Sequence, residues 1–129
     1  MLRLIFVLFT LVTSFSLVAQ LQTPSDFLGY DLGSYFSRHH QVVDYFEYVG
    51  ERSDMVTVSE YGRTDENRKL ITAIVSSSEN MSNLDEIMRK HELGENEEVA
   101  VVWLSYNVHG NESSGTEAAM QTLYDLIIG

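Results

Sequence analysis

The chain has 129 residues, and 8 Lys and Arg against 19 Asp and Glu give it a formal net charge of −11. This acidic balance excludes nucleic-acid binding through clustered Lys and Arg, and it disfavours docking on an anionic membrane surface. Hydrophobic residues make up 44% and charged residues 21%, which is typical of a globular chain rather than a disordered one. The length allows one domain at most, and the absence of Cys excludes disulfides, thiolate metal sites and Cys nucleophiles. Any metal must therefore be bound by His, Asp or Glu.

Residues 1–19 have the pattern of a secretory signal peptide. Arg3 supplies a short basic start, and the run from Leu4 to Val18 is apolar except for Thr and Ser. A membrane anchor needs about 20 apolar residues, and this run is shorter and rich in hydroxyl groups. We expect cleavage after Ala19 and export to the periplasm or the cell exterior, with no stable membrane span afterwards.

The first half of the mature chain predicts a lead-in, a helix and a hairpin. Residues 20–36 hold the only Pro and two Gly, which indicates an irregular lead-in segment. Apolar residues then recur at helical spacing as far as Gly50, with Ser37 as the expected N-cap. Alternating residues at 56–61 and a β-rich run at 70–76, joined by a polar turn, predict a β-hairpin.

The second half predicts a helix over 82–93, closed by Gly94, and a last helix over 116–128. Between them, the continuous apolar run 99–104 is typical of a strand covered on both faces, with Trp103 in the core. This order of elements predicts a layered α/β/α domain with a mixed sheet. Such a central strand needs neighbours on both edges and the hairpin supplies one, so we expect the fold to be incomplete and the chain to be the front part of a longer protein.

The candidate site follows the predicted buried strand. Ligand sites in α/β proteins lie at the carboxyl ends of strands, and the segment NVHGNE (residues 107–112) comes directly after this one. His109 and Glu112 are three residues apart, so both side chains can reach one Zn²⁺, with Gly110 allowing a tight turn between them. A catalytic zinc site normally has three protein ligands and a water. The spacing alone favours an exposed polar loop, and the position after the predicted strand brings the metal interpretation level with it.

Three segments, in this order, resemble the zinc metallocarboxypeptidases of the M14 family, particularly the bacterial exported members. Residues 37–48 are similar to the helix that opens that domain, and residues 60–68 resemble its hairpin motif of a Gly, a Ser or Thr, then Glu-Gly-Arg. Asn67 replaces the usual Gly, which is a mild departure because Asn tolerates a positive φ. The segment VWLSYNVHGNE resembles the strand and H-x-x-E motif that supply two zinc ligands. The resemblance covers roughly Pro24 to Gly129.

The resemblance implies that residues 37–129 form the N-terminal part of a zinc carboxypeptidase-like catalytic domain, with His109 and Glu112 as zinc ligands. The family's third ligand, a His, lies well downstream, as do its substrate-binding Arg and Tyr residues and its general-base Glu. None has a matching position here, so no catalytic residue is assigned within this chain. The implied activity is the release of C-terminal residues from peptide or protein substrates, and we expect this chain alone to be inactive.

Two other functions stay open. The HGNE tetrapeptide also resembles the related zinc N-acyl-amino-acid deacylases, although the hairpin motif and the export signal favour a peptidase. A non-catalytic exported domain that binds a partner through its acidic surface is the alternative from a different class. The sequence leaves the oligomeric state and the preferred C-terminal residue open.

The remaining candidate residues have structural interpretations that we prefer. The other histidines, His39, His40 and His91, are expected to be surface or capping residues. Glu117 could contact the metal ligands without binding the metal itself. The interpretation that we prefer is that it faces solvent or caps its helix.

Two pairs of side chains flank the candidate motifs. Arg63 and Arg68 either guide an anionic substrate or, as we prefer, carry solvated charge on the hairpin turn. Asn107 and Asn111 flank the predicted ligands, and we expect them to fix the loop by local hydrogen bonds.

Overall fold

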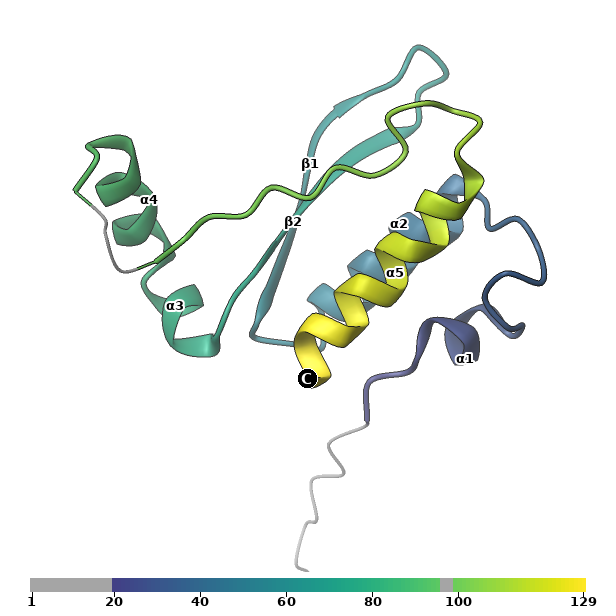
Figure 1. The fold of residues 1–129 in the computed structure, drawn as a ribbon, viewed down its shortest axis with the longest axis horizontal. Coiled ribbons are helices and arrows are strands. Elements are labelled where there is room, and N and C mark those ends of the chain that lie inside the picture. The colour runs from purple at the N-terminus through teal and green to yellow at the C-terminus, as the bar shows by residue number, and fades with distance from the viewer. Residues whose placement is uncertain (1–19, 96–98) are drawn as a thin grey trace, which may run out of the picture.

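The structure is a computed structural model that describes residues 20–95 and 99–129 (Figure 1). The predicted signal peptide lies outside the described residues. The elements, in chain order, are α1 (Pro24–Leu28), α2 (His39–Gly50), β1 (Val56–Arg63), β2 (Lys69–Val75), α3 (Ser78–Ser82), α4 (Leu84–Glu92) and α5 (Ser113–Ile128).

The predicted hairpin is confirmed. β1 and β2 pair antiparallel from Val56 opposite Val75 to Arg63 opposite Lys69, with an irregularity between Glu60 and Gly62. Asn67 has a φ of 61°, so this Asn adopts the left-handed conformation that the turn requires. The local pattern of alternating residues around a polar turn was therefore sufficient to predict this unit.

The core lies where α2 and α5 pack together beside the hairpin (Figure 1). α2 buries the face that its helical spacing predicts, because residues one or two turns apart point the same way. α5 buries its matching face, and β1 adds one residue at its start. The buried cluster consists of Tyr45, Val49, Val56, Met120 and Leu123.

The segment before α2 differs from the prediction in two respects. The lead-in segment (residues 20–36) contains α1, whose N-cap Thr23 accepts a hydrogen bond from the Asp26 backbone N–H at 3.1 Å. The N-cap position of α2 is taken by Arg38 rather than Ser37, and the Arg38 backbone N–H donates to the Gln41 side chain at 2.8 Å. Ser37 was the wrong choice because its hydroxyl is used in a distant contact, described below.

The helix predicted over 82–93 is confirmed as α4, and Gly94 follows it with a φ of 68°. The preceding helix α3 was not predicted. α3 begins after Ser77, whose hydroxyl accepts a hydrogen bond from the Asn80 backbone N–H at 3.2 Å. The helix is five residues long, which is too short to show a periodic apolar pattern in the sequence.

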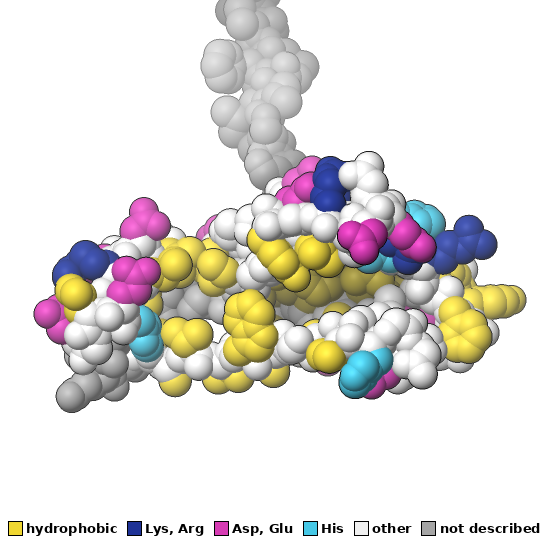
Figure 2. Space-filling view, turned by 90° about the horizontal axis from the view of Figure 1, so that it is seen from above, with side chains coloured by type: hydrophobic (Ala, Val, Ile, Leu, Met, Phe, Trp, Pro, Cys, Tyr) yellow, Lys and Arg dark blue, Asp and Glu magenta, His cyan; other side chains and the backbone are white. Residues whose placement is uncertain are grey.

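The prediction of a buried strand over 99–104 is wrong for this structure. The segment runs as extended coil from the end of the α4 region towards α5 (Figure 1), and the sheet of the described residues contains β1 and β2 only. The side chains of residues 100–104 are exposed rather than covered, including Trp103, which is 77% exposed. A strand requires a place in a sheet as well as an apolar composition, and the sheet formed by the described residues consists of β1 and β2. Hydrophobic side chains at the surface are visible in Figure 2.

The described residues thus confirm a mixed α/β composition but contain a two-stranded antiparallel sheet in place of the predicted mixed sheet. Within these same ranges, no helix has both the length and the apolar character needed to cross a bilayer.

The exposure of Trp103, the only Trp, predicts its fluorescence. We expect emission at the wavelength of a water-exposed indole and efficient quenching by acrylamide in the folded chain. A blue-shifted, poorly quenched signal would contradict the exposed placement of residues 101–104.

Tyr45 predicts how stability depends on alkaline pH. Burial raises the pKa of the Tyr45 phenol above its ordinary value of 10.0, and its hydroxyl donates to the Gln22 carbonyl at 3.1 Å. Above pH 10 the folded chain therefore binds more protons than the unfolded one, so stability is complete below that pH and is lost as the pH rises. Tyr45→Phe should destabilise by about 1 kcal/mol at pH 7 through the lost hydrogen bond. Urea titrations should show this gap closing as the pH rises above 10; a constant gap would contradict the assignment.

Candidate metal site

The two predicted ligands meet on the loop that leads into α5. The His109 Nδ1 atom lies 2.8 Å from Glu112 Oε1, and the other Glu112 oxygen accepts from the His109 backbone N–H at 3.4 Å. The Glu112 backbone N–H in turn donates to the His109 carbonyl at 3.1 Å, which closes a tight turn. The structure therefore brings this pair together, while their role as metal ligands stays a prediction.

The pair is open to solvent, because the side chains of His109 and Glu112 are 71% and 49% exposed. One imidazole nitrogen and one carboxylate oxygen are donors of the kind that Zn²⁺ prefers. In the part of the chain that the structure describes, no group of three His, Cys, Asp or Glu residues could hold a metal together. The two side chains are thus of the types that bind zinc. A catalytic zinc site has three protein ligands, one more than this pair provides.

α5 begins at Ser113, three residues before the predicted start, and Glu112 occupies its N-cap position. The Glu112 carboxylate makes no capping bond to the helix, since it faces back towards His109. A side-chain cap is normally worth about 0.5–2 kcal/mol. The loop therefore directs the Glu112 carboxylate towards His109, and the helix is left without a side-chain cap.

Asn107 fixes the loop to the first turn of α5, as its type and position predicted. It has a φ of 54°, and its side-chain amide donates to the Thr116 hydroxyl. Gly115 leaves room for this contact, because a Cβ atom there would lie 2.7 Å from Asn107 Oδ1. Asn111 is exposed on the same loop.

Glu117 lies in the second turn of α5 and is buried, with 9% exposure. It accepts hydrogen bonds from the Gly33 backbone N–H at 2.5 Å and from the Ser37 hydroxyl at 2.8 Å. The preferred prediction that Glu117 faces solvent or caps the helix is therefore wrong. Its partners are 84 and 80 residues away in sequence, so no local pattern signalled the contact. A cavity of about 460 Å³ adjoins it, lined by Gly33, Ser34, Tyr35, Phe36, Ser113, Ser114 and Glu117.

The other histidines lie apart from this pair. His39 Nε2 contacts the Lys69 carbonyl at 2.8 Å, which links α2 to the hairpin, and His40 is exposed. His91 departs from the expected surface role: its Nε2 atom is buried and has no hydrogen-bond partner among residues 20–95 and 99–129.

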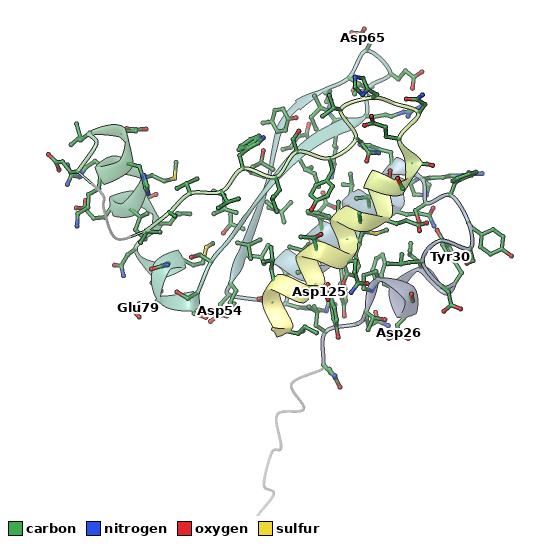
Figure 3. The ribbon with its side chains drawn as sticks, in the orientation of Figure 1. Asp26, Tyr30, Asp54, Asp65, Glu79 and Asp125 are labelled. Atoms are coloured by element: carbon green, nitrogen blue, oxygen red, sulfur yellow. The ribbon has the colours of Figure 1, made fainter. Side chains whose placement is uncertain are left out.

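The hairpin cations are exposed to solvent, as the preferred interpretation expected, and each also has a carboxylate neighbour. Arg63 pairs with Glu60 at 2.8 Å, and Arg68 pairs with Glu66 beside Asp65, which Figure 3 labels at the hairpin tip. These pairs are exposed, so each adds little to stability. Nearby, the hydrogen bond from Lys69 to Glu47 raises the pKa of that Lys.

The comparison with protein families assigns the chain to a class. The model of the zinc carboxypeptidase family, peptidase family M14, matches residues 42–128. The chain therefore belongs to the M14 zinc carboxypeptidase family, whose members are zinc-dependent and act on peptides. The match includes α2 from Val42 onward, the hairpin and the His109–Glu112 pair. No curated protein and no solved structure matches the chain.

The close approach of Asn107 to Gly115 predicts the effect of a single methyl group. Gly115→Ala should force the Asn107 side chain out of its contact with Thr116, and such overpacking typically destabilises by about 1–3 kcal/mol. Denaturant titration measures the change. Gly110→Ala is the matched control, because nothing lies within 4 Å of a Cβ atom at that position. Equal losses for the two variants would contradict the steric explanation.

Proposed function

We propose that this chain contributes His109 and Glu112 to the zinc centre of an exported carboxypeptidase that releases C-terminal residues from peptides. The observation that carries the proposal is the His109–Glu112 pair, with donor atoms 2.8 Å apart, inside the segment that the family model matches. Export is proposed from the signal-peptide pattern of residues 1–19.

Each residue of the pair has a definite role in the proposal. His109 would give the lone pair of an imidazole nitrogen and Glu112 a carboxylate oxygen, and both side chains are reachable from solvent. When bound, zinc would supply polarisation of the scissile carbonyl and activation of a water molecule. Asn107 would hold the loop in place through Thr116 while substrate binds.

The proposal also states what this pair does not supply. Two protein ligands are one fewer than a catalytic zinc site uses, and a general base is needed to take a proton from the attacking water. We therefore expect no peptidase turnover from the 129-residue chain by itself. Zinc-dependent cleavage of a peptide by the isolated chain would contradict this part of the proposal.

Zinc titration tests the ligand assignment directly. By calorimetry, His109→Ala and Glu112→Ala should each weaken zinc binding at least about tenfold, since each removes one of two protein ligands. The unfolding transition of both variants should stay close to that of the unsubstituted chain, because the two side chains are exposed.

The matched control for adventitious binding is His40→Ala, which removes another exposed His. It should leave the zinc affinity unchanged. If His40→Ala weakens binding as much as His109→Ala, or if the unsubstituted chain binds no zinc, the ligand assignment is wrong.

A further inference from the structure

We propose that Glu117 is a positioning residue for the His109–Glu112 pair: its buried carboxylate clamps the start of α5 to the lead-in segment. The inference rests on the proposed function, because it concerns how firmly the predicted zinc ligands are held in place. Its contacts are nevertheless independent of any metal.

The first step is the contact itself. A buried carboxylate is unfavourable unless it is hydrogen-bonded, and both oxygens of Glu117 are used. One accepts from the Gly33 backbone and the other from the Ser37 hydroxyl, which also contacts the Tyr30 hydroxyl at 2.9 Å. Figure 3 shows Tyr30 on the lead-in side of the molecule, beyond α1. The carboxylate thus joins α5 to a segment about 80 residues earlier in the chain.

The second step is the need for this clamp. The exposed residues Ser113 and Ser114 begin α5, and the helix has no side-chain cap. Burial of its apolar face starts only at Ala119 and Met120. Between the uncapped start and that core, the described tertiary side-chain bonds of the helix are the one from Asn107 to Thr116 and those of Glu117.

The third step connects the clamp to the pair. The Gly115 backbone N–H donates to the Glu112 carbonyl at 3.0 Å, and the Glu112 N–H donates to the His109 carbonyl at 3.1 Å. Two successive turns therefore link the clamped part of α5 to His109. If the start of α5 frays, the Glu112 carboxylate loses its fixed direction, and the two donor atoms no longer meet.

The experiment compares Glu117→Ala with Glu117→Gln in the full chain. Zinc affinity is measured by calorimetry, and exchange of the Gly115 amide is measured by NMR without zinc. Glu117→Ala should weaken zinc binding about tenfold, as loss of a supporting residue behind a ligand commonly does, and should speed exchange at Gly115. Glu117→Gln should recover most of the zinc affinity and most of the protection of the Gly115 amide, because the Gln side chain can accept from Gly33 and donate to the Ser37 oxygen.

A variant that only destabilises the fold provides the matched control. Val56→Ala removes buried methyl groups from the core and should lower stability while leaving zinc affinity unchanged. If it weakens zinc binding as much as Glu117→Ala does, Glu117 acts only through overall stability and the inference is wrong.

The two proposals fail separately. If the unsubstituted chain binds no zinc, the proposed function is wrong, and the Gly115 exchange rates alone decide the role of Glu117. If exchange at Gly115 in Glu117→Ala equals that of the unsubstituted chain, the clamp does not order the start of α5 and the inference is overturned.

Discussion

The packing of α5 against α2 is the constraint on which the rest of the structure depends. Met120 and Leu123 of α5 meet Tyr45 and Val49 of α2, residues separated by about 70 positions in sequence. Val56 at the start of β1 joins the same cluster, so the hairpin is anchored through one end. α1 contributes the Phe27 ring, which contacts Tyr45 edge-on with centroids 5.2 Å apart. This small core therefore places α5, the helix that follows the candidate site.

The start of α5 shows a conflict between stability and site geometry. Its N-cap residue, Glu112, directs the carboxylate towards His109 instead of the helix. The missing cap leaves backbone N–H groups of the first turn without their usual side-chain partner. Asn107 holds this first turn through the Thr116 hydroxyl, and Glu117 holds the next turn through the Gly33 backbone and the Ser37 hydroxyl. Local strain or lost capping of this kind is characteristic of functional sites, where surrounding contacts compensate for it.

Features that depend on residues close together in the sequence were predicted correctly, whereas features that depend on distant residues were not. The sequence pattern records the interactions between residues close together in the chain. These are the hairpin, the positive φ of Asn67 and the convergence of His109 and Glu112. Residues 99–104 were misassigned because apolar composition reports a preference for burial, whereas a strand also needs a neighbouring strand.

Ser37 and Glu117 were misassigned for the complementary reason. Each has a residue type suited to a local cap, and each is instead used in a contact across 80 residues. The His109–Glu112 pair needs both kinds of interaction. Local spacing sets the 2.8 Å hydrogen bond between the two side chains. The long-range contact of Glu117 with Gly33 involves the helix that begins directly after Glu112. In the proposed zinc site, a pair already held close together would lose little freedom on binding the metal, so its affinity would depend on the contacts that order the loop as well as on the two ligands themselves.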